Sequence, residues 1–125
     1  MSNMKVLVVE DEAPLMNAIM AKMKKSELSA VGVNSVAEAR QKIDESKPDL
    51  IWLDHYLFGA EDGLDLLKEL KSNEETKEIP VFVVSNTCTN EKYHDYMELG
   101  IEKYFIKSSS KLEDIISEAK KYIIQ

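Results

Sequence analysis

Five short apolar runs separate the sequence into segments that have the spacing of amphipathic helices. The runs comprise residues 5–9, 30–33, 50–53, 81–84 and 104–106. The first, third and fourth runs are continuous rather than alternating, which is typical of strands covered on both faces of a parallel sheet. Apolar runs that alternate with helical segments predict five successive strand–helix units. The sequence therefore indicates a fold of the α/β class.

Residues that commonly begin or end helices stand at the expected boundaries. They are Pro14 in the first helix, Ser35 with Glu38 opening the second, Asp62 with Gly63 opening the third, Gly100 ending a fourth over about residues 90–99, and Ser110 with Glu113 opening the fifth. Right-handed crossovers between parallel strands then predict a flavodoxin-like (βα)5 three-layer sandwich with a five-stranded parallel sheet.

Length and composition narrow the class of protein further. A chain of 125 residues without repeats or linkers is expected to form a single domain over residues 1–125. A net charge of −7 disfavours direct binding to nucleic acid. A single cysteine, Cys88, excludes an intramolecular disulfide and a cysteine-rich zinc site. There is no apolar run of the roughly 20 residues that a membrane span needs and no signal-peptide pattern, so a cytoplasmic location is expected.

Polar side chains directly follow four of the predicted strands: Glu10 and Asp11, Asp54, Ser85, and Lys107. Ligands of open parallel sheets bind outside the carboxyl ends of the strands, where these side chains should meet. Three neighbouring carboxylates repel one another unless a cation neutralises them, and oxygen ligands favour Mg²⁺, with Mn²⁺ as an alternative. Lys107 and Ser85 can then contact an anion held over Asp54, as a carboxylate nucleophile toward phosphorus requires.

Each of these residues alone has a simpler explanation. Asp54 can merely end a strand, and Glu10 and Asp11 can be acids favoured by the dipole of the following helix. Serine and lysine at such positions are usually capping and solvated residues. A site is favoured because all of them fall at the same end of their strands.

The chain also resembles the receiver domain of bacterial two-component response regulators over nearly its whole length. The resemblance rests on residues 8–12, 48–54, 62–64, 80–85, Gly100 and 104–107. It implies that Asp54 accepts a phosphoryl group from a histidine kinase or a histidine phosphotransfer protein. Asp11, Asp54 and the carbonyl of Tyr56 would ligate Mg²⁺, and Glu10 would hold a metal-bound water.

The resemblance further implies that Ser85 and Lys107 contact the phosphoryl group and that Tyr104 rotates inward when Ser85 moves. The protein would then be a switch and not an enzyme. Its fourth helix, fifth strand and fifth helix would bind a downstream protein or a second copy of the chain, with no direct contact to nucleic acid or membrane. The chain ends soon after the fifth helix, so a stand-alone receiver or an excised domain is expected.

Several positions depart from the family pattern. Leu57 and Phe58 replace a Met-Pro pair, the loop before Gly63 is one residue longer, Asn86 replaces a small residue, and Ser108 replaces a proline whose peptide bond is typically cis. These changes keep open a pseudo-receiver, which is an interaction module that is not phosphorylated. A Mg²⁺-dependent phosphohydrolase is disfavoured because Tyr56 stands where a second acid is needed. A flavin carrier is disfavoured by the acidic loop after the first strand.

Other residues are not assigned to the site. His55 and His94 are expected in a loop and on a helix surface, and Cys88 as an ordinary loop thiol. Trp52 should pack below the site because it shares strand parity with Asp54. Tyr93, Tyr96 and Met97 form either core or a partner-binding face, and helix-spaced aromatic residues are more often core.

Overall fold

The computed structural model describes residues 5–86 and 89–123, so Cys88 lies outside the described residues. Five parallel strands form one sheet in the order β2-β1-β3-β4-β5. The strands are β1 (Lys5–Val9), β2 (Ser29–Val33), β3 (Leu50–Leu53), β4 (Val81–Ser85) and β5 (Lys103–Ile106). The helices are α1 (Ala13–Lys25), α2 (Val36–Glu45), α3 (Gly63–Lys71), α4 (Asn90–Leu99) and α5 (Leu112–Ile123), with a 3₁₀ turn over Lys107–Ser109. The predicted flavodoxin-like fold is confirmed.

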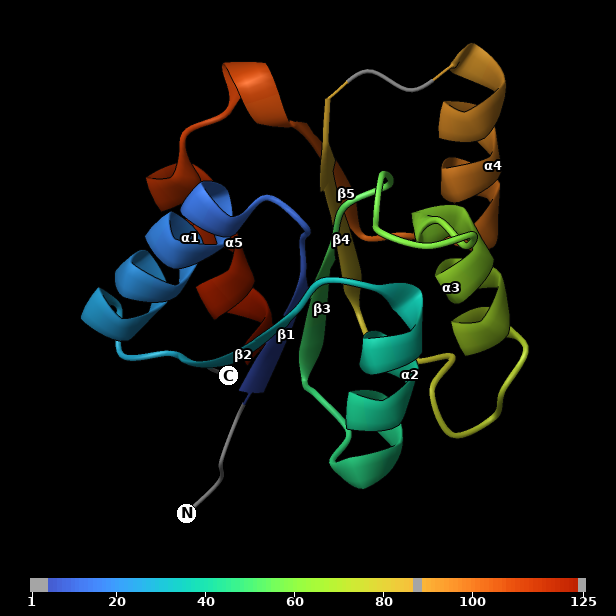
Figure 1. Cartoon of the computed structure of the whole chain (residues 1–125), viewed down its shortest axis with the longest axis horizontal. Coiled ribbons are helices and arrows are strands. Elements are labelled where there is room, and N and C mark those ends of the chain that lie inside the picture. Colours follow the sequence, from blue (N-terminus) through green and yellow to red (C-terminus); the bar gives the residue numbers. More distant parts are fainter. Residues whose placement is uncertain (1–4, 87–88, 124–125) are drawn as a thin grey trace.

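Helices cover both faces of the sheet and produce three layers. Helices α1 and α5 lie on one face, and α2, α3 and α4 lie on the other (Figure 1). Successive strand residues point to opposite faces, so each strand supplies both cores. Leu7, Ile51 and Val83 belong to the core under α2, α3 and α4. Trp52 and Phe82 belong to the core under α1 and α5, so Trp52 is fully buried.

The burial of the strands follows their position in the sheet. Every residue of β3 and β4 is buried, as is all of β1 except Lys5. Strands β2 and β5 lie at the two edges and remain partly exposed. The two apolar runs that are not continuous in the sequence therefore correspond to the edge strands, which have one neighbour instead of two.

The helix ends follow the sequence signals with one exception. Asp62 and Asp65 form a complete capping box at the start of α3, and Gly100 ends α4 in the left-handed conformation with φ 92°. Ser35 Oγ accepts a hydrogen bond from the Glu38 N–H, as predicted. The fifth helix is present, but it begins one residue later than a cap at Ser110 predicts: α5 begins at Leu112, and Glu113 pairs with Lys22 of α1 at 2.7 Å. Within the described ranges, none of the helices combines the length and the apolar character that crossing a bilayer requires.

Candidate functional site

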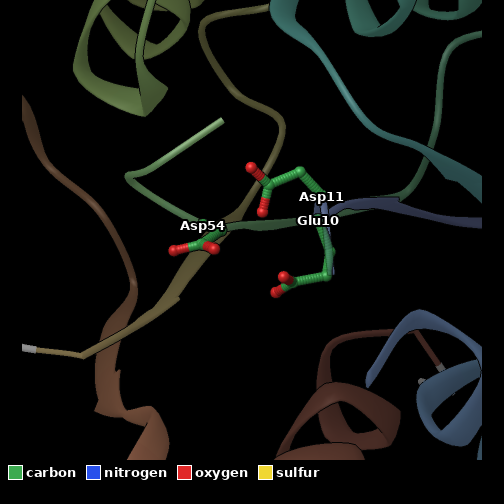
Figure 2. A group of neighbouring side chains, drawn as sticks. All are labelled: Glu10, Asp11 and Asp54. Atoms are coloured by element: carbon green, nitrogen blue, oxygen red, sulfur yellow. The ribbon is translucent and has the colours of Figure 1, made fainter. Parts of the chain in front are cut away.

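Three carboxylates meet at the carboxyl ends of β1 and β3. Glu10 and Asp11 directly follow β1, and Asp54 directly follows β3. The Asp54 N–H donates to the carbonyl oxygen of Val9 in β1 at 3.0 Å. One oxygen from each of the three residues lies within 4.8 Å of the others. Figure 2 shows the three carboxyl groups gathered at this edge of the sheet. The structure therefore brings together the acidic residues that the sequence predicted to converge.

Burial and mutual repulsion make this cluster electrostatically unfavourable when it is charged. Burial raises the pKa of Glu10, and the charge of Asp54 raises it further. The pKa of Asp11 is raised by the same two causes in the same order. A raised carboxyl pKa means that the folded chain binds protons here more readily than the unfolded chain does, so the ionised cluster costs stability at neutral pH.

Lys107 supplies a positive charge to the cluster. Its Nζ donates to Asp54 Oδ2 at 2.9 Å, to Glu12 Oε1 at 3.1 Å and to Glu10 Oε2 at 3.4 Å. Burial alone lowers the pKa of Lys107, but the hydrogen bonds and charges of Asp54 and Glu10 outweigh it, and the pKa is raised. Lys107 is therefore charged and held against Asp54.

Glu12 was not selected as a site residue from the sequence, although it directly follows Asp11. The sequence contained a signal that could have indicated it: Glu12 is a third consecutive acidic residue after the first strand, at the N-cap of α1.

The donor set fits a hard divalent cation. Three carboxylates provide oxygen ligands, with no histidine or cysteine in this group of described residues, as Mg²⁺ or Mn²⁺ prefers. The Oε1 atom of Glu10 is buried and accepts no hydrogen bond from the described residues, although Lys107 Nζ lies 3.1 Å away. The contact is an ion pair without hydrogen-bond geometry, so this oxygen retains a lone pair for a cation or a metal-bound water.

Ser85 presents a second buried polar atom at the same edge of the sheet. It is the last residue of β4 and is fully buried. Its Oγ finds no hydrogen-bond partner within residues 5–86 and 89–123. A buried hydroxyl without a partner is costly, so it marks a place where a polar ligand is expected to bind.

The two tyrosines implied by the resemblance each lie near a residue of the site or the residue that follows one. The N–H of Tyr56 lies 3.4 Å from Asp54 Oδ1, and 55% of the Tyr56 residue surface is exposed. The Tyr104 hydroxyl donates to the carbonyl of Asn86, the residue after Ser85, at 3.3 Å. Tyr104 is therefore linked to the chain segment that carries the Ser85 hydroxyl.

The departures at Asn86 and Ser108 are structurally connected. The Lys107–Ser108 peptide is trans, and residues Lys107–Ser109 form a 3₁₀ turn. The Ser108 N–H donates to Asn86 Oδ1 at 2.9 Å. A proline at position 108 has no N–H and could not make this bond. The loop that carries Lys107 thus contains a hydrogen bond that requires the Asn86 side chain and a residue other than proline at position 108.

His55 lies in a loop as expected, and it is buried. Its Nδ1 forms a 2.6 Å hydrogen bond with the hydroxyl of Tyr96, a fully buried residue of α4. Burial lowers the pKa of His55, which favours the neutral ring. His55 shares strand parity with Leu53, and this signal could have indicated that it faces the core under α3 and α4. The site is therefore joined to α4 by a buried polar contact.

The sequence left open whether Tyr93, Tyr96 and Met97 of α4 lie in the core or on the surface. Tyr96 is core, whereas Tyr93 and Met97 are 45% and 46% exposed. Ile106 of β5 is also exposed, and the Tyr93 ring contacts the Tyr104 ring with centroids 5.0 Å apart. His94 lies on the helix surface, as expected, 3.4 Å from Glu98.

Comparison with known proteins agrees with this geometry. Residues 6–120 match the family model of the response regulator receiver domain. Phosphate regulon transcriptional regulatory protein PhoB of Pseudomonas aeruginosa is 30% identical over 108 residues, which cover 86% of this chain and 47% of PhoB. The chain thus spans about half the length of such relatives. Chemotaxis protein CheY1 of Helicobacter pylori is 26% identical over 83% of this chain and 85% of its own length.

Solved structures show the same likeness. A response regulator receiver protein from Pseudomonas putida has a TM-score of 0.89 and 27% identity, and the match covers 97% of this chain and 98% of that one. The phosphorylated cyanobacterial phytochrome response regulator RcpA has a TM-score of 0.85 and 26% identity, with 99% and 96% covered. With its fold, its acidic site and the family match in agreement, the chain belongs to the response regulator receiver domain family.

Proposed function

We propose that this protein is a phosphoacceptor switch of a two-component system and that Asp54 is the residue phosphorylated. The observation that carries the proposal is the 2.9 Å contact between Asp54 Oδ2 and Lys107 Nζ inside a cluster of carboxylates. This group of side chains combines a nucleophilic oxygen, a fixed positive charge for the incoming phosphoryl group and a donor set for a divalent cation. The donor would be a histidine kinase or a histidine phosphotransfer protein, in the cytoplasm.

The chemistry requires one bond to form and one to break. An Asp54 carboxylate oxygen attacks phosphorus while the bond from phosphorus to the donor's imidazole nitrogen breaks, and the electron pair leaves with that nitrogen. Lys107, which contacts Asp54, would contact the phosphoryl oxygens, and the Ser85 Oγ, which has no hydrogen-bond partner among the described residues, would donate to another. Fixed donors that face developing negative charge are an effective source of transition-state stabilisation. RcpA, which shares the fold, is known in a phosphorylated form.

Labelling tests this proposal directly. Incubation with phosphoramidate or acetyl phosphate and Mg²⁺ is expected to add one phosphate to the intact mass, as an acyl phosphate that is lost at alkaline pH. Asp54→Asn removes the acceptor while nearly preserving its shape, so labelling should fall to background. Asp49→Asn is a matched control, because Asp49 directly precedes β3, where its carboxylate accepts a hydrogen bond from the Lys5 N–H at 2.6 Å. An unlabelled parent protein would favour the pseudo-receiver function, and full labelling of Asp54→Asn would assign the phosphate to another residue.

Mg²⁺ would be held by Glu10, Asp11 and Asp54, with the carbonyl of Tyr56 as a further ligand. When bound, the cation would neutralise the carboxylates and the charge of the phosphoryl group. Glu10, which is almost fully buried, would act through a metal-bound water, since its carboxylate is already fixed by the Glu12 N–H at 3.0 Å.

Asp11→Asn is expected to change stability in opposite directions with and without Mg²⁺. The pKa of Asp11 is raised, so its charge destabilises the metal-free fold above that pKa, and the neutral amide should raise the free energy of unfolding at pH 7. Stabilisation by saturating Mg²⁺, about 2.7 kcal/mol at 100 times Kd in the parent, should be largely lost. Urea unfolding with and without Mg²⁺ measures both effects. An undiminished Mg²⁺ effect in the variant would remove Asp11 from the ligand set.

The partner surface is proposed to consist of α4, β5 and α5. Exposed Tyr93, Met97 and Ile106 give it apolar contact area. The contacts of Tyr104 with Asn86 and Tyr93 connect this surface to the segment that follows Ser85. A shift of Ser85 toward a phosphoryl group would therefore change the surface offered to a downstream protein or to a second copy of the chain.

A further inference from the structure

We propose that Glu12 is a positioning residue that competes with the phosphoryl group for Lys107. This inference rests on the proposed phosphorylation of Asp54. It adds a residue that lies outside the acidic triad and the switch residues.

The ammonium group of Lys107 is fully engaged before any phosphoryl group arrives. An ammonium has three N–H donors, and these point to one oxygen each of Asp54, Glu12 and Glu10. A phosphoryl oxygen can become a partner of Lys107 only if one of the three carboxylates gives way. The identity of that carboxylate decides how easily Lys107 is released.

Two of the three carboxylates are held in place. The side chains of Glu10 and Asp54 are 0% and 3% exposed. Glu10 is also fixed by the hydrogen bond from the Glu12 N–H. Until the bond between Asp54 and phosphorus forms, moving either carboxylate away from Lys107 would leave a buried carboxylate without its ammonium partner, which is strongly unfavourable.

Glu12 is the partner that can leave. Its side chain is 62% exposed, and water can replace Lys107 around it. Glu12 occupies the N-cap position of α1 but makes no side-chain cap hydrogen bond, so its rotation does not disturb the start of the helix. Glu12 therefore holds Lys107 in the unphosphorylated state and releases it to the phosphoryl group.

The negative charge of Glu12 also opposes binding of the phosphoryl group. Glu10, Asp11, Glu12 and Asp54 place four carboxylates around one lysine, so even with a bound divalent cation an anionic phosphoryl group approaches a site without excess positive charge. The Glu12 carboxylate lies 3.1 Å from the ammonium that would hold the phosphoryl group. Removing one water-screened negative charge at such short range corresponds to about a three- to ten-fold gain in anion binding. Loss of the competing hydrogen bond acts in the same direction.

Beryllium fluoride, an anionic mimic of the phosphoryl group, tests this inference without bond formation. Its binding in saturating Mg²⁺ can be followed by Trp52 fluorescence or by calorimetry. Glu12→Gln is expected to bind it about three- to ten-fold more tightly than the parent at low salt. The ratio should shrink toward one near 1 M salt, because an exposed charge is screened. A purely structural role of Glu12 would not produce this salt dependence.

Glu113→Gln is the matched control. Glu113 is also an exposed glutamate near a helix start, and it pairs with Lys22 at 2.7 Å on the α1–α5 side. The control removes the same charge from the chain and should leave the affinity unchanged. Phosphorylation by phosphoramidate should be accelerated in Glu12→Gln and not in Glu113→Gln.

The outcomes separate the two proposals. Equal affinity of Glu12→Gln and the parent, with both binding, overturns the role of Glu12 and leaves the proposed function standing. No beryllium fluoride binding and no labelling of Asp54 in the parent overturns the proposed function, and the role of Glu12 with it. Tighter binding in both Glu12→Gln and Glu113→Gln would show a general charge effect and overturn the specific role.

Discussion

Replacing Lys107 with methionine is expected to destabilise the metal-free protein by about 3–5 kcal/mol at pH 7. Lys107 Nζ is the cation in contact with Asp54 and Glu10, whose side chains are almost fully buried. Methionine preserves most of the side-chain volume, so the loss reports mainly on the two uncompensated charges. Mg²⁺ should restore part of the stability, because it neutralises the same carboxylates.

The loss of stability in Lys107→Met should become smaller as the pH falls. Burial and the charge of Asp54 already raise the pKa of Glu10 in the parent, and removal of Lys107 raises it further. A carboxyl with a raised pKa in the folded state costs stability only while it is charged, and the cost disappears as the pH falls through that pKa. The deficit of Lys107→Met should therefore shrink as the pH is lowered from 7, as measured by urea unfolding at each pH.

The rate at which the protein is phosphorylated is expected to fall in Lys107→Met as well. Loss of one fixed donor to the transferring group commonly costs about 10²–10³-fold in rate, so labelling by phosphoramidate should slow by that order. Lys103→Met is the control, since Lys103 lies 3.8 Å from Glu118 in an exposed pair. Such pairs contribute about 0–1 kcal/mol. Equal stability and equal labelling rates in the two variants would contradict the role given to Lys107.

Replacing Gly63 with alanine is expected to destabilise the fold by about 1–3 kcal/mol and to disturb Asp54. A Cβ at position 63 would lie 2.5 Å from the carbonyl oxygen of Asp54 and 2.9 Å from the Tyr96 hydroxyl. The carbonyl belongs to the backbone and is fixed by the sheet, so α3 must move away from the end of β3. This movement would also break the 2.9 Å hydrogen bond from the Gly63 N–H to His55 O.

Gly32→Ala is the control for this substitution. A Cβ at Gly32 would meet Met16 Sδ at 2.6 Å, but that atom lies at the end of a flexible side chain that can turn aside. Its cost should be small, because alanine also reduces the entropy of the unfolded chain by an amount worth about 0.4–1 kcal/mol. Urea unfolding compares the two variants, and phosphoramidate labelling should slow only in Gly63→Ala. Equal stability of the two would show that the start of α3 is less closely packed than these distances indicate.

Much of the fold could be predicted from local patterns. Continuous apolar runs marked the inner strands β1, β3 and β4, and broken runs marked the edge strands. Gly100 marked the end of α4, because few residues other than glycine adopt its positive φ. Glu10, Asp11 and Asp54 were found because parallel strands place their carboxyl ends at one edge, so position along the chain implies position in space.

Contacts between segments far apart in the chain could not be predicted in this way. The pairing of Glu113 with Lys22 was not foreseen, because the proximity of these residues is set by the packing of α1 against α5. The buried His55 bonds to Tyr96, 41 residues later, and the Ser108 N–H bonds to Asn86 Oδ1, 22 residues earlier.

The sequence by itself determined the strand–helix order, the two layers of helices and the edge of the sheet where acidic, hydroxyl and ammonium groups meet. These follow from hydrophobic period and from backbone conformation, which are properties of residues a few positions apart. Only the tertiary structure decided that Lys107 is shared among Asp54, Glu10 and Glu12, and that a histidine beside Asp54 reaches α4. Hydrogen bonds and ion pairs act over about 3 Å. Which groups come that close is decided by how the layers pack and not by their separation along the chain.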